Sequence, residues 1–193
     1  MSTGVFAVVA KRIAPGQGAG ASMDKGTDSR GAGGAAGPIG GRTIGGALTG
    51  VGPRPGPPPV LRFDQYIPHP PSAVWRALTD PGLLALWWAS GDVRPEVGHR
   101  FTLDVGAWGV QPCEVTAVEP ERLLEYHFAE GVLDTVITWS LEAEDEGTRL
   151  HLSHSGFDLD SLQGRLAYSG MGNGWPHVLN GVERALDAVS ARS

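Results

Sequence analysis

The stretch Thr135–Phe157, TVITWSLEAEDEGTRLHLSHSGF, decides the fold of this chain. Its centre, Glu144–Gly147, is polar and ends in Gly, which is typical of a four-residue hairpin loop. Two strands closed around this loop would have one apolar and one polar face, as in an antiparallel sheet that lines an interior. His154 would be the one titratable group on the apolar face. The predicted pairs are Leu141–Leu150, Trp139–Leu152 and Ile137–His154 on the apolar face, and Glu142–Arg149, Ser140–His151 and Thr138–Ser153 on the polar face.

A second hairpin is predicted upstream, from Val110–Val118 and Leu123–Phe128 around a turn at Pro120-Glu121. It again has one apolar and one polar face, and two hairpins that agree indicate a curved antiparallel sheet. The predicted pairs are Cys113–Phe128, Val115–Tyr126 and Ala117–Leu124 on the apolar face, and Glu114–His127 and Thr116–Glu125 on the polar face.

Turn and helix signals predict the remaining elements. Two short helices begin at Pro71 and after Asp80, because Pro suits the first helical turn and Asp is a favoured N-cap. A final amphipathic helix begins at Trp175, and the stretch Phe157–Asn173 before it is predicted to be irregular. The apolar stripe of that helix is Val178, Leu179, Val182, Leu186 and Val189. Further strands are predicted at Leu61–Ile67, Val93–Val97 and His99–Val105.

The segment TWSLEAEDEGTRLHLSHSGF resembles the signature hairpin of the Hsp-90 ATPase activator homologue-like (C-terminal domain) family, within the START-like, SRPBCC superfamily. The similarity extends to PPSAVWRALTDPGLLALWW (Pro70–Trp88) and GWPHVLNGVERAL (Gly174–Leu186), and it covers roughly Val60–Ala191. It implies an α+β helix-grip fold, in which a curved antiparallel sheet wraps around a long C-terminal helix and two short helices follow the first strand. The space between sheet and final helix is the ligand cavity of that fold. The family has no shared chemistry, so the resemblance implies a cavity and not a particular reaction.

Composition divides the chain at about Val60. Residues 1–59 contain 16 of the 29 glycines, 7 of the 15 prolines and no Trp, so they cannot bury enough apolar surface to offset the entropy of ordering. They are predicted to be a disordered Gly/Pro-rich extension, unless translation truly starts later, at Met23, Val51 or Val60. Residues 60–193 are predicted to form one START-like domain.

Charge and cysteine content exclude several classes of function. The net charge is −6, and because residues 1–59 carry six basic and two acidic residues, the domain itself carries −10. Such a domain repels phosphate backbones, which argues against nucleic-acid binding. No apolar run approaches the length of a membrane span. Cys113 is the single cysteine and permits no intramolecular disulfide, which fits a cytoplasmic protein.

The inward faces supply the candidate binding residues. Tryptophans offer a large contact area to a planar apolar ligand, although Trp139 and Trp175 fit a core role better. His154 is either a ligand-contacting donor or a buried histidine bonded to backbone or to Tyr126. Burial should lower its pKa, since no carboxylate shares its face, and His154→Leu is expected to leave the fold intact. The predicted ligand-binding residues are Trp87, Trp88, Trp108, Val115, Tyr126, Phe128, Ile137, Trp139, His154, Val178 and Val182.

No catalytic residue, metal site or cofactor is predicted. His151 and His154 lie three apart on a strand and therefore on opposite faces, so they cannot bind one metal ion. The predicted function is non-enzymatic binding of a small hydrophobic or aromatic molecule, or a lipid, in the cavity. One alternative is a protein-interaction module that assists a chaperone, although co-activators of that type carry a folded, charged domain where this chain has its Gly/Pro-rich segment. The other is a cavity enzyme of cyclase or hydratase type with His154 and Tyr126 as acid and base, by analogy of fold.

Overall fold

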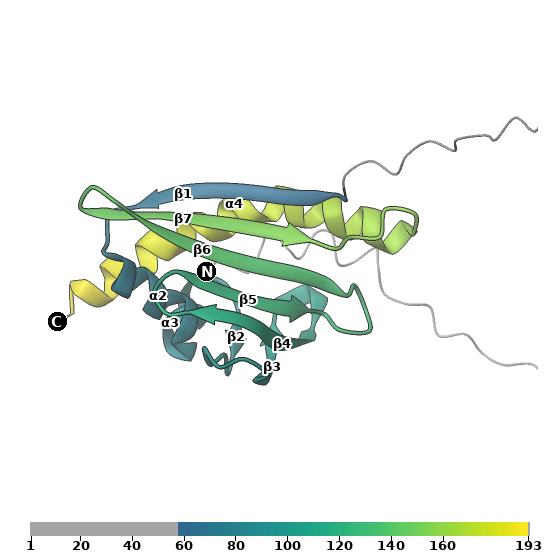
Figure 1. Ribbon diagram of the computed structural model, residues 1–193, viewed down its shortest axis with the longest axis horizontal. Coiled ribbons are helices and arrows are strands. Elements are labelled where there is room, and N and C mark those ends of the chain that lie inside the picture. Colours follow the sequence, from purple (N-terminus) through teal and green to yellow (C-terminus); the bar gives the residue numbers. More distant parts are fainter. Residues whose placement is uncertain (1–57, 193) are drawn as a thin grey trace, which may run out of the picture. The chain divides into compact units, whose positions relative to one another are not determined.

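A curved antiparallel sheet packs against one long helix in the computed structural model, which describes residues 58–192 (Figure 1). The sheet order is β1-β7-β6-β5-β4-β3-β2. The predicted α+β helix-grip fold is confirmed, whereas the predicted extension lies outside the described residues except for Pro58 and Pro59. The elements are β1 (Val60–Ile67), α2 (Pro71–Thr79), α3 (Pro81–Trp87), β2 (Ser90–Gly91), β3 (Arg100–Asp104), a 3-10 turn (Gly106–Trp108), β4 (Val110–Glu119), β5 (Leu123–Phe128), β6 (Thr135–Glu144), β7 (Gly147–Ser155) and α4 (Leu162–Ser190).

The hairpin of β6 and β7 has the register that the sequence predicts. All six predicted pairs are present, from Ile137–His154 at one end to Glu142–Arg149 at the other. The strands continue to the pair Glu144–Gly147, so the loop proper contains only two residues. The inward residues of both strands are buried, and β1 pairs with the other side of β7. The apolar face of this hairpin therefore forms part of the core.

The hairpin of β4 and β5 follows the prediction only near its open end. Cys113 pairs with Phe128 and Val115 with Tyr126, but the register shifts between Val115 and Ala117. The pair Ala117–Leu124 is therefore wrong, because Leu124 pairs with Val118. Thr116 is the extra residue of a β-bulge, which bends a strand and increases its twist. The predicted backbone pair Thr116–Glu125 is likewise absent, but the Thr116 hydroxyl still donates to the Glu125 carboxylate at 2.9 Å.

The predicted strand Val93–Val97 is wrong. Pro95 has no N–H to donate to a ladder, the amide of Glu96 donates to the carbonyl of Arg94 at 2.8 Å, and the following Gly98 has a φ of +85°. This segment is therefore a turn. The short strand β2 lies earlier in the chain and pairs with β3.

The two short helices after β1 are confirmed. Asp80 caps α3, because its side chain accepts a hydrogen bond from the amide of Leu83 at 3.0 Å and Pro81 opens the helix. The Trp87 indole N–H then donates to the carbonyl of Ala77 on α2 at 2.9 Å. The two helices are thereby joined through a buried side chain.

Helix α4 is longer than predicted, because it begins at Leu162 and not at Trp175. Ser161 caps it by accepting a hydrogen bond from the amide of Gly164 at 2.9 Å. A side chain at Gly164 would overlap the carbonyl of Asp158. The prediction of an irregular stretch up to Asn173 is therefore wrong from Leu162 onward. In the part of the chain that the structure describes, no helix has the length and apolar character needed to cross a membrane.

Candidate ligand-binding site

A cluster of aromatic rings lies between the sheet and α4. The ring of Trp88, just after α3, lies 5.1 Å from that of Trp175 on α4 and 5.9 Å from that of Trp139 on β6, measured between centroids. It also lies 6.5 Å from the ring of Phe128 at the end of β5. Edge-to-face and tilted contacts at these distances are favourable. Rings from β5, β6, α4 and the end of α3 thus meet in one aromatic cluster.

A small cavity of about 20 Å³ remains beside this cluster. Its volume is close to the minimum that holds one water molecule. Its lining side chains are all aromatic or apolar. The lining residues are Trp88, Val105, Trp108, Phe128, Met171 and Trp175.

Trp108, one of the lining residues, carries a polar group without a partner. Among the described residues, its Nε1 is buried and has no hydrogen-bond partner. A buried donor without an acceptor costs roughly 1–3 kcal/mol. The residue lies in a short 3-10 turn between Gly106 and Gly109, whose φ angles are +71° and +74°. A ligand atom that accepts a hydrogen bond could remove this penalty.

His154 forms the centre of a buried hydrogen-bond chain. Its Nδ1 accepts from the indole N–H of Trp175 at 3.2 Å. An indole nitrogen is only a donor, so the imidazole proton lies on Nε2, which is 2.9 Å from the hydroxyl oxygen of Thr135. That hydroxyl in turn donates to the carbonyl of Phe128 at 3.3 Å. Both ring nitrogens of His154 are thus occupied.

Burial lowers the pKa of His154 from 6.5 to about 3, as the sequence predicts in direction. The side chain is fully buried, and the rings of Phe128, Phe157 and Trp175 surround it. No solvation remains to stabilise a charged imidazolium. His154 is therefore neutral at physiological pH.

Tyr126 is held separately from His154. Its hydroxyl accepts a hydrogen bond from the Trp139 indole N–H at 3.0 Å, and burial raises the pKa of the phenol well above its ordinary value. Neither Tyr126 nor His154 is part of the cavity wall. The acid and base pair required by the enzyme alternative is therefore not brought to one point. Residues 58–192 also contain no cluster of His, Cys, Asp or Glu side chains that could hold a metal ion.

The structure brings only part of the predicted site together. Trp88, Trp108 and Phe128 line the cavity, whereas Trp87 lies in a separate groove between α3 and α4. The cavity wall also includes three residues outside the predicted set, Val105, Met171 and Trp175. The other predicted residues are buried in the core: Val115, Tyr126, Ile137, Trp139, His154, Val178 and Val182.

Similarity to known proteins follows the fold. Residues 68–187 match the family described as "Activator of Hsp90 ATPase homolog 1-like protein". Protein MLL2253 from Mesorhizobium loti is 37% identical, with 67% of this chain and 98% of that chain covered and a TM-score of 0.60. Protein BH1534 from Bacillus halodurans is 25% identical, with 66% and 96% covered and a TM-score of 0.59. CalU16 from Micromonospora echinospora is 26% identical, with 69% and 79% covered and a TM-score of 0.53. Curated proteins give no match.

Proposed function

The chain belongs to the Activator of Hsp90 ATPase homolog 1-like family, and we propose that its domain binds a small aromatic molecule between the sheet and α4. The family and its START-like fold support a ligand-binding or protein-interaction module in general. The finer proposal depends on the cavity wall. Four of its six residues are aromatic and the other two are Val105 and Met171.

The unpaired indole N–H of Trp108 carries the proposal. Buried polar groups in folded proteins nearly always have a partner, so each exception needs an explanation. Trp108 lines the same cavity as three other aromatic rings. A planar ligand with a carbonyl or ether oxygen would stack on these rings and accept the hydrogen bond. We therefore expect a preference for aromatic ligands that carry an acceptor.

Binding of such a ligand requires the cavity to enlarge, because 20 Å³ admits no molecule larger than water. The turn of Gly106–Trp108 is the element best suited to move. Gly106 and Gly109 bound it, with φ angles of +71° and +74° that other residues rarely adopt. Val105 and Trp108 would move outward together. Loop rearrangements on binding occur in a substantial minority of complexes.

A matched pair of probes tests this proposal. 2-Acetylnaphthalene and 2-ethylnaphthalene have similar size, but only the ketone accepts a hydrogen bond. We expect the ketone to bind the wild-type chain about tenfold more tightly in a tryptophan-fluorescence titration, since one such bond is worth roughly 1–1.5 kcal/mol. Trp108→Phe keeps a ring and removes the donor, so it should abolish the preference. His127→Leu, on the exposed face of β5, serves as the matched control and should retain it.

Two results would overturn the proposal. One is equal affinity for both probes in the wild-type chain. The other is failure of either probe to bind, together with native mass spectrometry that shows only the mass of the bare chain.

A protein-interaction module is the second candidate. The near-filled interior favours it, because a cavity of about 20 Å³ leaves the outer surface as the place for recognition. The family description points to the same class of function. Failure of both naphthalene probes would favour this candidate over the first.

A further inference from the structure

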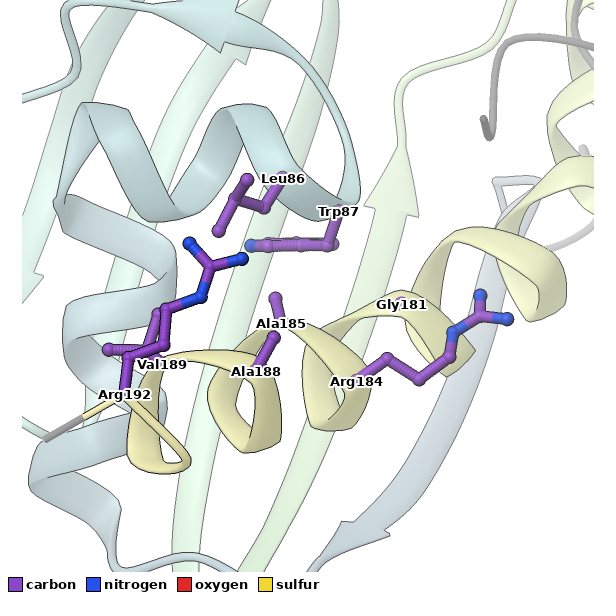
Figure 2. Close-up of a pocket in the computed structure, with 8 residues that line it drawn as sticks. All are labelled: Leu86, Trp87, Gly181, Arg184, Ala185, Ala188, Val189 and Arg192. Carbon is purple, nitrogen blue, oxygen red and sulfur yellow. The ribbon is translucent and has the colours of Figure 1, made fainter.

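A second hollow lies on the outside of the domain, between α3 and the C-terminal half of α4 (Figure 2). Its volume is about 370 Å³, which falls in the range of small-molecule pockets. At about 30 Å³ per water molecule it has room for roughly a dozen non-hydrogen atoms. It shares no lining residue with the interior cavity. The lining residues are Leu86, Trp87, Gly181, Arg184, Ala185, Ala188, Val189 and Arg192.

Small residues on α4 produce this groove. Gly181 allows the closest approach of the two helices, because a Cβ there would lie 3.0 Å from the Cβ of Trp87. Ala185 and Ala188 follow at successive turns of α4 and are too short to fill the space under α3. Leu86, on the α3 side, consequently remains 59% exposed. The groove therefore has an apolar floor.

Two arginines are among the lining residues of this groove, and none of the lining residues is acidic. Within residues 58–192, the arginines that form ion pairs are Arg100 and Arg149, and neither lines the groove. Figure 2 shows the Arg192 side chain directed toward Leu86 and Trp87, while that of Arg184 is directed away from them. A local positive charge is notable in a chain of net charge −6. This positive charge would favour the binding of an anionic ligand in the groove.

We propose that this groove binds a small monocarboxylate with an apolar body, such as a medium-chain or aryl carboxylic acid. The guanidinium of Arg192 would bind the carboxylate in a bidentate pair, for which its planar fork of donors is suited. The apolar body would lie on Leu86, Ala185 and Ala188. Arg184, at the other end of the groove, would attract the carboxylate electrostatically without contacting it. This site is independent of the interior cavity and of the function proposed for it.

Decanoate and decanol form the probe pair, because they share a chain of the same length and differ in charge. Isothermal titration of the full chain below micelle-forming concentrations should show at least tenfold tighter binding of decanoate. Arg192→Ala should weaken decanoate binding tenfold or more, since a charge-assisted hydrogen bond is lost. Arg94→Ala removes the same charge from an exposed arginine outside the groove, so it should change the affinity less than twofold. Ala188→Leu fills the groove and should abolish binding without lowering the melting temperature by more than about 2 °C.

Nuclear magnetic resonance locates the probe. Decanoate should shift the indole N–H signal of Trp87, which lines the groove, and leave those of Trp108 and Trp175 unchanged. Shifts at Trp108 and Trp175 alone would place decanoate in the interior cavity and overturn the groove proposal. Equal binding of decanol, or equal effects of Arg192→Ala and Arg94→Ala, would overturn it as well.

Discussion

His154 and Trp108 are both close to the interior cavity, yet they differ in whether their polar groups have hydrogen-bond partners. Both ring nitrogens of His154 have partners, whereas the indole N–H of Trp108 has none among the described residues. Trp175 and Phe128 connect the two regions, since each bonds within the His154 chain and also lines the cavity. The fully bonded His154 is thus part of the packing behind the wall, whereas under the proposed function the unpaired indole N–H of Trp108 is the group that a ligand would bind. A titratable residue on the inner face is therefore not by itself the recognition group.

The largest expected effect is loss of stability in His154→Leu. The sequence alone suggests a harmless change, but the structure shows that it would leave the Trp175 indole N–H without an acceptor and Thr135 without a donor. Unpaired buried groups cost roughly 1–3 kcal/mol each, so we expect the free energy of unfolding to fall by about 2–4 kcal/mol. Urea denaturation measures it. His127→Leu, at an exposed position, should change it by less than about 0.5 kcal/mol.

A double-mutant cycle sharpens this prediction. Trp175→Phe removes the donor that His154→Leu leaves unpaired. The double variant should therefore be more stable than the sum of the single changes predicts, by about 1–2 kcal/mol. Strict additivity would show that the hydrogen bond of Trp175 to His154 contributes nothing.

Acid should destabilise the wild-type domain through the same residue. The pKa of His154 is about 3 in the folded chain and near 6.5 when unfolded, so between these values the unfolded state binds an extra proton. The stability is fully present above pH 6.5 and is lost as the pH falls toward 3. From pH 7 to pH 5 this amounts to about 2 kcal/mol. Urea titrations at both pH values measure the loss.

His154→Leu supplies the control for the acid prediction. Its stability should change less between pH 7 and pH 5 than that of the wild type, because the buried titrating group is absent. The groups around His154 are Thr135, Trp175 and two phenylalanines, and none of them titrates in this range. An equal loss in both chains would show that His154 is not the source of the acid sensitivity.

The sequence predicts the sheet well where alternation alone sets the register. From Ile137 to Glu142 and from Arg149 to Ser153, polar and apolar residues alternate without interruption, and a shift by one residue would bury the polar face. In β4 the inserted Thr116 changes the phase of the strand. A polar residue at that position fits the unshifted alternation equally well, and the one sign of the bulge is Val118, which the unshifted register would place on the polar face.

The cavity wall was partly predictable. Ala167, Met171 and Trp175 are buried and extend the stripe of Val178 backward at helical spacing. Several glycines obscure this signal, because Gly disfavours helix by roughly 1 kcal/mol relative to Ala. Packing against the sheet outweighs that cost. Trp108, by contrast, was predicted as a binding residue, but only coordinates reveal that its indole nitrogen lacks a partner.

A smaller effect is expected for Tyr126→Phe. This change removes one acceptor, that of the Trp139 indole N–H, and keeps the ring and its edge contact with Phe101. Only one buried donor is left unpaired, so we expect a loss of about 1–2 kcal/mol in urea denaturation. Tyr168→Phe, in a half-buried tyrosine, is the matched control and should change stability by less than about 0.5 kcal/mol. Equal effects in the two variants would contradict the structural role of the Tyr126 hydroxyl.

The smallest effect on stability is expected for Trp108→Phe. Its N–H already lacks a partner in the folded chain, so removing it relieves a desolvation cost, while the smaller ring gives up some apolar contact. The two terms oppose each other, and we expect the free energy of unfolding to change by no more than about 1 kcal/mol. The same urea titration used for His154→Leu measures it. A loss as large as that of His154→Leu would mean that the Trp108 indole stabilises the fold. The contrast between the hydrogen-bonded His154 and the unpaired Trp108 would then be wrong.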